Sequence, residues 1–277
     1  MKAMIFAAGL GTRLKPLTDN LPKALVPLAG KTLLQWQIER LKAAGITDIV
    51  VNVHHFPDMI INYLRENDNF GCHISVSDER DMLLETGGGL RKAKNLLLGV
   101  ATHESRNNDT PILICNVDIL SNIDIPTLLQ AYNPDEMGVV VVSPRDTQRY
   151  LLFDPSNRLC GWTNIATGEV RPASLVSSLN ILPSTGEADL QAKPTYQLQR
   201  SDLSPLAFSG MQVLNPRIFD AMDRVVLEKG EKFSLIDLYL SIAEKEILRA
   251  FIPENYRMMD VGKIAQLSEA EEFASTL

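Results

Sequence analysis

The sequence is poor in cysteine and has no long apolar run. Its three cysteines, Cys72, Cys115 and Cys160, lie far apart and form neither a CxxC pair nor a dense framework. This pattern excludes a disulfide scaffold and leads us to expect a reducing, cytoplasmic location. The apolar residues 3–8 are too few for a signal peptide, because Gly9 follows at once. No other run approaches the roughly 18 apolar residues that a membrane span requires.

Basic residues are also in the minority. The chain has 34 acidic and 27 basic residues, a formal net charge of -7, which is the wrong sign for a protein that gathers the phosphates of long nucleic acids. Any phosphate group must therefore be held locally. A hydrophobic fraction of 45% over 277 residues allows a substantial core, and we expect one elaborated domain over residues 1–277.

The first half of the chain alternates short apolar runs with amphipathic segments. This alternation is typical of a parallel sheet with helices on both faces. The apolar runs predict strands at residues 3–7, 48–53, 73–76, 111–116 and 138–142. The amphipathic segments predict helices at residues 33–44, 59–64 and 90–97.

The alternation fades between residues 143 and 204, where prolines and glycines interrupt the chain repeatedly. We interpret this stretch as a loop-rich insertion with short strands that covers one side of the binding pocket. Regular structure returns at residues 206–214, with a helix near residues 234–246 and a terminal helix from about Ile264. The fold class predicted is α/β.

A small-residue turn at residues 8–13 directly follows the first predicted strand. Its glycines let backbone N–H groups approach phosphate oxygens, although such glycines can also serve only a tight turn. A dinucleotide fingerprint would need a glycine at Leu14 and an acidic residue among residues 52–54, and both are missing. A P-loop ending in residues 30–32 would need a glycine at Leu25. Both of these nucleotide-binding motifs are therefore excluded.

The stretch from Gly9 to Leu34 resembles the signature of the sugar-1-phosphate nucleotidyltransferases. Further segments agree in order with that family: LETGGG at residues 84–89, NVD at 116–118, FSG at 208–210 and MDVG at 259–262. The resemblance implies a Rossmann-like, mixed but mostly parallel sheet with helices on both faces. It also implies that a nucleoside triphosphate and a sugar 1-phosphate are joined, with release of pyrophosphate. In these terms residues 1–142 form a nucleotide-binding half and residues 143–277 a sugar-binding half.

Within the family, LETGGG is most similar to the N-acetylmuramate α-1-phosphate uridylyltransferases, which favours UTP as the nucleotide. Mannose- or heptose-1-phosphate guanylyltransferases and glucose-1-phosphate thymidylyltransferases have close patterns, and transfer to another phosphate monoester such as phosphocholine is a further alternative. A non-catalytic nucleotide-sugar-binding regulatory protein would be expected to have lost one of Arg13, Lys23, Asp118 or Asp260, and all four are present. The resemblance implies that the protein binds neither nucleic acid nor a membrane, and it is compatible with a homo-oligomer.

The implied reaction is electrostatically difficult, because two polyanions must meet and charge develops on the leaving pyrophosphate. The resemblance assigns Arg13 and Lys23 as the catalytic cations. The Arg13 guanidinium can fork onto the β and γ phosphates, and the Lys23 ammonium can bridge the α phosphate and the sugar phosphate.

Asp118 and Asp260 are the candidate metal ligands. Two unit charges about 4 Å apart repel by roughly 4 kcal/mol at an effective dielectric of about 20, so carboxylates that face a triphosphate require a cation. Oxygen ligands around phosphates point to Mg²⁺, as one or two ions. His54 and His55 lack further histidine or cysteine ligands and are given no metal role.

The remaining expected contacts come from the resemblance as well. The expected nucleotide-binding residues are Ala7, Ala8, Gly9, Gly11, Thr12 and Gly88. The expected sugar-binding residues are Glu85, Thr86, Asn116, Ser209 and Gly210. Arg145, Arg149 and Lys232 are left outside the predicted site, because nothing in the sequence separates them from a solvated face.

Overall fold

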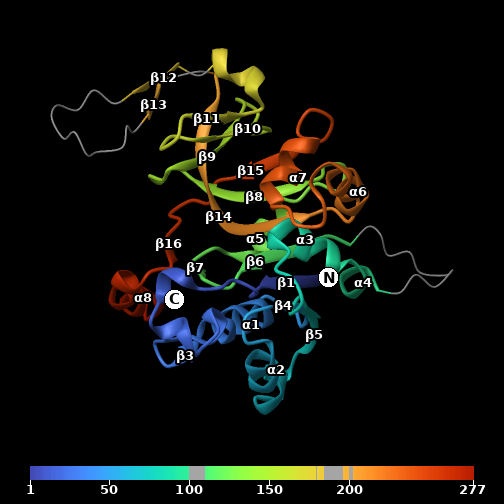
Figure 1. The fold of residues 1–277 in the computed structure, drawn as a ribbon, viewed down its shortest axis with the longest axis vertical. Helices are drawn as coiled ribbons and strands as arrows, with labels where there is room; N and C mark the ends of the chain where they lie inside the picture. Colours follow the sequence, from blue (N-terminus) through green and yellow to red (C-terminus); the bar gives the residue numbers. More distant parts are fainter. Residues whose placement is uncertain (100–109, 179, 184–195, 200–201) are drawn as a thin grey trace.

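A large mixed β-sheet divides the molecule into two layers of helices in the computed structural model (Figure 1). The structure describes residues 1–99, 110–178, 180–183, 196–199 and 202–277. Residues 184–195 of the predicted insertion therefore lie outside the described residues. No helix in the described part of the chain is long and apolar enough to cross a membrane.

The N-terminal strands form the parallel part of the sheet. β1 (Lys2–Phe6) lies between β4 (Asp48–Val53) and β6 (Ile112–Asn116), and β5 (His73–Asp78) pairs with β4, all in parallel. β1, β4 and β6 are short, mostly apolar runs, as expected for strands covered on both faces, whereas β5 at the edge of the sheet is more polar and less buried. The predicted strands at residues 3–7, 48–53, 73–76 and 111–116 are confirmed within the uncertainty of strand ends.

β14 joins the sheet next to β6 in antiparallel orientation and connects it to further strands. β14 (Ser204–Leu214) pairs with β6, with β8 (Gly138–Ser143) and with β9 (Arg149–Phe153). β15 (Leu248–Phe251) extends the sheet beyond β8, and β10 (Leu159–Asn164) and β11 (Glu169–Arg171) extend it beyond β9. The Rossmann-like α/β class is thus confirmed, with the mixed character coming from β14 and its neighbours.

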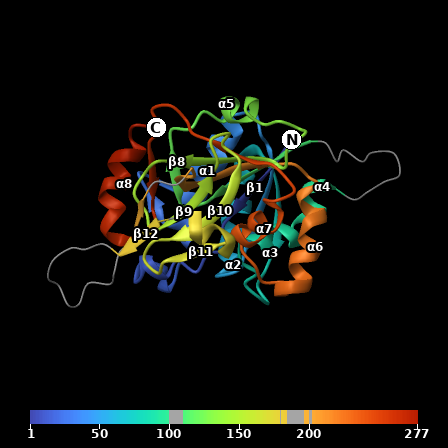
Figure 2. The same cartoon turned by 90° about the horizontal axis from the view of Figure 1, so that it is seen from above.

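Two hydrophobic clusters cover the opposite faces of this sheet because side chains alternate along each strand. Ala3 and Ile5 of β1 face one cluster, and Met4 faces the other. The first cluster receives α1 (Leu33–Ala43), α2 (Pro57–Glu66), α5 (Ile125–Gln130) and α8 (Leu267–Ala274). The second receives α3 (Glu85–Lys92), α4 (Lys94–Leu98), α6 (Ile218–Lys229) and α7 (Leu235–Ile242). Figure 2 shows α8 and α6 on opposite sides of the molecule.

Local signals explain where individual helices begin and end. The Thr32 side chain accepts a hydrogen bond from Gln35 N at the start of α1, and Gly45 adopts φ 79° just beyond its end. A capping box between Ser234 and Asp237 starts α7. α6 and β15 were not predicted, although Ile218 and Val225 show that α6 buries one apolar face.

The described part of the predicted insertion is more regular than expected. β9, β10 and β11 form an antiparallel extension of the central sheet, and β12 (Asn180–Pro183) and β13 (Tyr196–Gln199) form a separate pair. Short strands are therefore confirmed, but none of the described insertion residues lines the cavity at the candidate site. These strands are held together by hydrogen bonds between their backbones. The frequent prolines and glycines made the strands difficult to predict from the sequence.

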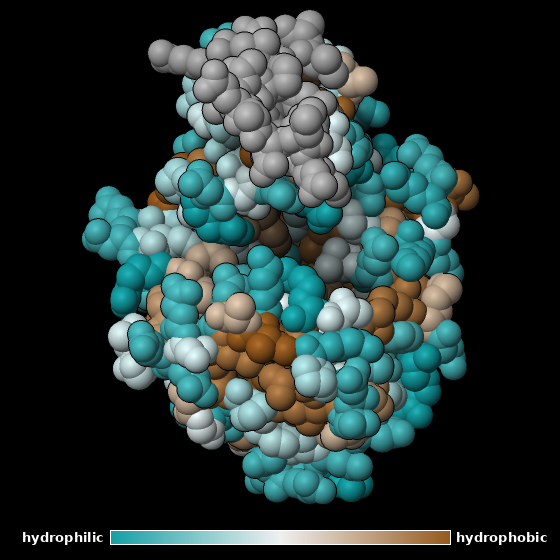
Figure 3. Space-filling view, turned by 60° about the vertical axis from the view of Figure 1, so that its left-hand side comes forward, coloured by the Kyte–Doolittle hydropathy of each residue, from teal (hydrophilic) through white to brown (hydrophobic). Residues whose placement is uncertain are grey.

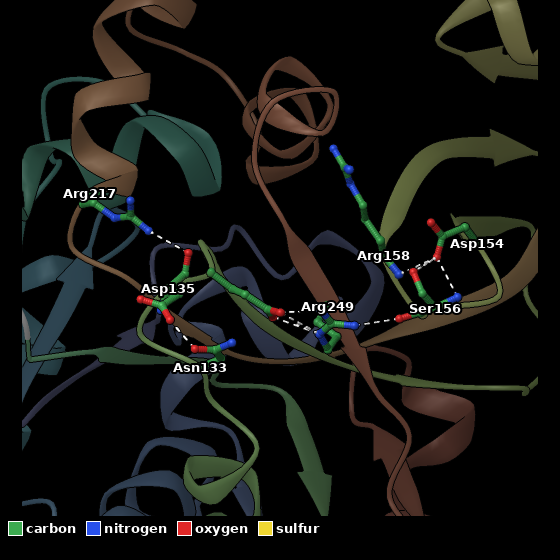
Figure 4. Close-up of polar contacts among 8 residues, drawn as sticks. Asn133, Asp135, Asp154, Ser156, Arg158, Arg217 and Arg249 are labelled. Atoms are coloured by element: carbon green, nitrogen blue, oxygen red, sulfur yellow. Dashed lines mark hydrogen bonds and ion pairs between the residues drawn. The ribbon is translucent and has the colours of Figure 1, made fainter.

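A buried ion pair ties this extension to the rest of the sheet (Figure 4). Glu136, which precedes β8 and is 7% exposed, accepts hydrogen bonds from the Arg249 guanidinium of β15. Arg249 Nη1 also donates to the Ser156 carbonyl at 2.7 Å, and Ser156 belongs to the turn between β9 and β10. A single guanidinium thus connects three segments, so the extension has a fixed position on the sheet.

Candidate active site

A cavity of about 350 Å³ opens at the carboxyl ends of β1, β4 and β6. Ligands commonly bind at this edge in open α/β sheets. Figure 3 shows a recess across the middle of the face that contains this edge. The cavity is lined by Phe6, Ala8, Gly9, Lys23, Asn52, Leu83, Glu85, Thr86, Asn116, Val117 and Asp118. Seven of the predicted site residues are therefore gathered around one space.

Lys23 and Asp118 form an ion pair inside this cavity. Lys23 begins the short helix η3 (Lys23–Leu25) and is 9% exposed, and its ammonium group contacts the Asp118 carboxylate directly. Asp118 follows β6, so the end of a buried strand fixes its backbone. A cation and an anion are thus held in a largely desolvated position, where their interaction is stronger than in water.

Arg13 and Asp260 form a second pair on the same edge. Arg13 Nη2 lies 3.8 Å from Asp260 Oδ2, and both side chains are about half exposed. Asp260 ends β16 (Met258–Asp260), which pairs with β7 (Ile119–Ser121) directly after Asp118. Val261 N donates a hydrogen bond to the Asp118 carbonyl at 2.8 Å. The predicted gathering of the two cations and the two carboxylates at the sheet edge is what the structure shows.

In the glycine loop at residues 8–13, Gly11 lets the backbone pack closely against Thr18 and Lys23. Gly11 adopts φ 65°, and an added Cβ would lie 2.8 Å from Thr18 Cγ2 and 3.1 Å from Lys23 Cβ. The Gly11 carbonyl accepts hydrogen bonds from Leu14 N and from Thr18 Oγ1, both at 2.8 Å. Thr12, by contrast, is exposed. Gly9 is also exposed and has no atom within 4 Å of an added Cβ, so its backbone is accessible to a ligand.

The two carboxylates are suited to hold a divalent cation together with phosphate oxygens. Asp260 Oδ1 is buried and has no hydrogen-bond partner within the described part of the protein. Gly262 leaves room around it, because an added Cβ would lie 2.6 Å from Asp260 Oδ1 and 2.5 Å from Arg13 Nη2. The described residues contain no group of three or more His, Cys, Asp or Glu side chains that could hold a metal. Mg²⁺ commonly takes one or two carboxylates and completes its shell with substrate phosphates and water, so the residues present fit it.

Several expected backbone donors and side-chain contacts are already used within the protein. Gly87 N and Gly88 N both donate to the Phe233 carbonyl, at 2.9 and 3.1 Å. Thr86 Oγ1 accepts a hydrogen bond from Leu235 N, at the start of α7. The prediction that Gly88 offers a free donor to the nucleotide is therefore wrong, because packing of α3 against the segment before α7 consumes it. Ala7 N is likewise occupied, by Asn52 Oδ1 at 2.8 Å.

Ser209 and Gly210 do not follow a strand but lie within β14, at a register shift between Phe208 and Gln212. The Ser209 side chain is buried at 1% exposure, and its hydroxyl lies 3.4 Å from both Ser143 Oγ and the Ala207 carbonyl. Gly210 adopts φ 74° and packs against Ile119. Neither residue lines the cavity, so the expectation of a strand-end contact is corrected: the bulge turns the pair into the sheet.

Two buried residues next to the cavity have no counterpart among the predictions. Asn52, the next-to-last residue of β4, lines the cavity, and Glu79 follows β5 with no exposed surface. Burial raises the pKa of Glu79, against the lowering effect of hydrogen bonds from Asn52 and Leu84 N. Asn52 stands near the end of a predicted strand, but from the sequence it was considered only as evidence against a dinucleotide-binding motif. The available signal was a polar residue at the end of an otherwise apolar strand.

Comparison with known sequences identifies relatives over the half of the chain that builds the cavity. The sequence model of the nucleotidyl transferase family matches residues 2–150. An N-acetylmuramate alpha-1-phosphate uridylyltransferase of Caulobacter vibrioides is 38% identical over 152 residues, 53% of this chain and 59% of that protein. The enzyme of the same name from Neisseria meningitidis serogroup B is 42% identical over 130 residues, 47% of this chain and 52% of that protein. The match thus spans just over half the length of these relatives.

Other relatives act on other sugars, and the solved structures share the fold. A mannose-1-phosphate guanyltransferase of Neurospora crassa is 37% identical over 153 residues, 54% of this chain and 40% of that protein. A putative glucose-1-phosphate thymidylyltransferase of Bacillus anthracis superimposes with a TM-score of 0.73 at 16% identity, over 100% of this chain and 96% of that one. At that identity the structural similarity establishes the fold alone.

Proposed function

Because the chain belongs to the nucleotidyl transferase family, we propose that it transfers a nucleotidyl group from a nucleoside triphosphate to a sugar 1-phosphate, releasing pyrophosphate. The observation that supports this most directly is the meeting of Arg13, Lys23, Asp118 and Asp260 at one sheet edge. A regulatory protein that only binds nucleotide sugars would not need two cations and two carboxylates in this position.

In the proposed reaction an oxygen of the sugar phosphate attacks the α phosphorus of the nucleotide. A new P–O bond forms, the bond to the bridging oxygen of the β phosphate breaks, and that oxygen leaves with pyrophosphate. Lys23 is held inside the cavity and would bring the two reacting phosphates together, while the more exposed Arg13 would bind the leaving pyrophosphate. Charge neutralisation and alignment are the main requirements of such a transfer.

Asp118 and Asp260 would hold Mg²⁺ in this proposal. Asp260 Oδ1 is a buried oxygen with no hydrogen-bond partner among the described residues, and Asp118 would have to exchange its contact with Lys23 for one with the ion when substrate binds. Mg²⁺ bound to phosphate oxygens supplies neutralisation of the charge that develops on the α phosphate and on pyrophosphate. Lys23 would then be released toward the incoming phosphate.

The substrates we propose are UTP and N-acetylmuramate 1-phosphate. Two relatives named N-acetylmuramate alpha-1-phosphate uridylyltransferase support this choice, at 38% and 42% identity over 53% and 47% of the chain. Every residue that lines the cavity lies between Phe6 and Asp118, which supports residues 1–142 as the nucleotide-binding half. Residues 143–277 would then supply most sugar contacts, and through Asp260 they would also contribute to the proposed metal site. A mannose or glucose 1-phosphate with GTP or dTTP is the second candidate, favoured by the guanyltransferase match.

The test is a pyrophosphate-release screen of UTP, dTTP, GTP and CTP against a panel of sugar 1-phosphates, with Mg²⁺ present. The panel includes N-acetylmuramate, mannose and glucose 1-phosphates. We expect turnover to be highest with UTP and N-acetylmuramate 1-phosphate, and to vanish when the sugar phosphate is left out. Turnover with another pair would move the substrate assignment. Binding of nucleotide sugars without any turnover would contradict the proposed activity.

A further inference from the structure

A continuous chain of hydrogen bonds runs beneath the cavity from one wall to the other. Ala7 N donates to Asn52 Oδ1 at 2.8 Å, and Asn52 Nδ2 donates to Glu79 Oε1 at 2.6 Å. On the far side, Leu84 N donates to Glu79 Oε2 at 3.3 Å. Two side chains therefore join the strand end before Gly9 to the segment that precedes α3.

The direction of these bonds is fixed by chemistry. Both ends of the chain are backbone N–H groups, which can only donate. Asn52 must turn its oxygen toward Ala7, so its NH₂ group faces position 79. Position 79 must then accept from both sides, and the two carboxyl oxygens of Glu79 do so.

The surroundings leave the pair no substitute partner. Glu79 is fully buried and Asn52 is 2% exposed, so solvent does not readily replace a lost bond. Gly89, in the first turns of α3, makes room for the contact: an added Cβ would lie 2.7 Å from Glu79 Oε1 and 3.0 Å from Asn52 Nδ2. The third glycine of the LETGGG segment thus has a packing role against this pair.

We infer that Asn52 and Glu79 are positioning residues, which hold the Ala7–Gly9 wall and the Leu84–Thr86 wall at the separation that fits the nucleotide. This inference rests on the proposed function, because it takes the cavity to be the nucleotide site. The pair does not contact the Lys23 and Asp118 side chains by any hydrogen bond described in the structure. Its disruption should therefore weaken nucleotide binding more than it slows the transfer step.

Two single substitutions and their combination test this idea. Glu79→Gln puts an NH₂ group against one of the two donors, and Asn52→Asp puts a second acceptor against Glu79. The double variant Asn52→Asp/Glu79→Gln restores all three hydrogen bonds. In the bond between positions 52 and 79 the donor and the acceptor are exchanged, so that the new amide at position 79 donates to the new carboxylate at position 52. Asn215→Asp is the matched control, because Asn215 is a buried asparagine that joins Pro134 O and Arg217 N and does not line the cavity.

The measurements are KM for UTP, or for the triphosphate that the screen selects, together with kcat. We expect each single variant to raise KM roughly tenfold or more with kcat changed less than about threefold, from the loss of one buried hydrogen bond. The double variant should return KM to within about threefold of the parent. Asn215→Asp should lower the unfolding temperature without a change in KM.

Amide hydrogen exchange of Ala7 and Leu84 in the ligand-free protein provides a readout independent of activity. Exchange should accelerate in both single variants and slow again in the double variant. If the parent used no nucleotide, this measurement would still decide whether the pair holds the two walls. A double variant no better than the single ones, or single variants with unchanged KM, would overturn the inference.

Discussion

Val261 N donates a hydrogen bond to the Asp118 carbonyl oxygen, and this bond brings the C-terminal MDVG segment against the end of the central strand β6. The pairing of β16 with β7 continues the contact from Asp260 to Met258. Two carboxylates far apart in the sequence, Asp118 and Asp260, are thereby fixed on neighbouring backbone positions. The proposed metal site depends on this small two-stranded sheet.

Removal of either carboxylate should sharply reduce metal-supported turnover. We expect Asp118→Asn and Asp260→Asn each to lower kcat by roughly 10²–10³-fold, the scale of losing one preorganised electrostatic contact. The measurement is kcat across a Mg²⁺ titration, with folding checked by thermal unfolding. Asp124→Asn is the control, because Asp124 caps α5 and should affect stability but not turnover. Near-normal turnover of either site variant in excess Mg²⁺ would contradict the metal role.

Lys23→Met should remove roughly 3–4 kcal/mol of transition-state stabilisation, since a buried cation beside the reacting phosphates acts like a preorganised donor. The change shortens the side chain by one atom and removes the ammonium group with its charge and donors. Single-turnover rates at saturating nucleotide would measure it. Lys31→Met is the matched control, because Lys31 pairs with Glu39 and lies over the Trp36 ring. An undiminished rate for Lys23→Met would remove Lys23 from the mechanism.

Gly262→Ala should damage the site without unfolding the protein. The added methyl group would fall within 2.6 Å of Asp260 Oδ1 and Arg13 Nη2, so both side chains must move. We expect kcat/KM to fall by up to ~10²-fold, because displacements of about 1 Å at a reacting centre have effects of this size. An unchanged kcat/KM with an unchanged requirement for Mg²⁺ would show that Asp260 and Arg13 need no fixed position.

Asp237 should make the free energy of unfolding of the protein depend on pH in the acid range. Burial raises the pKa of Asp237, but hydrogen bonds from Ser234 and Lys229 outweigh this effect and lower the pKa overall. The folded state therefore binds the proton less tightly than the unfolded state. The stabilisation is fully present when the pH is above the pKa of Asp237 in the unfolded chain, about 3.9. It is lost as the pH falls through the lower pKa of Asp237 in the folded protein.

Asp237→Asn should accordingly reduce the free energy of unfolding at pH 7 by about 1–2 kcal/mol, through the weakened capping box and the lost ion pairs. Asp237 Oδ1 lies 3.0 Å from both Arg171 Nη1 and Lys229 Nζ. Urea unfolding at pH 7 and at successively lower pH would measure the difference, with the exposed Asp220→Asn as control. A difference that stayed constant down to the lowest pH would contradict the assigned cause.

The sequence made the parallel core of the fold predictable. Short apolar runs separated by amphipathic segments, such as residues 48–53 after residues 33–44, can bury their surface only as strands between two layers of helices. The same reasoning missed α6 and β15, which lie beyond the interrupted stretch at residues 143–204. Their place is set by contacts with α7 and β8, which no local pattern contains.

The site shows the same division. The resemblance of the motifs, and the position of Asp118 after a predicted strand, were enough to expect the two cations and the two carboxylates at one sheet edge. The ion pairs between Lys23 and Asp118 and between Arg13 and Asp260 were found only in the tertiary structure. Which hydrogen-bonding groups remain free was decided only by tertiary packing. The N–H groups of Gly87 and Gly88 look accessible in the sequence, yet Phe233 uses both.

The sequence by itself therefore determined the class of fold, the nature of the charged groups and the edge of the sheet where they gather, since periodicity and motif order are local properties. Only the tertiary structure decided that Ser209 turns into the sheet, that Asn52 and Glu79 join the two walls of the cavity, and that Asp260 has a free buried oxygen. Such outcomes depend on which distant groups compete for each hydrogen bond. That competition is settled when the chain is packed.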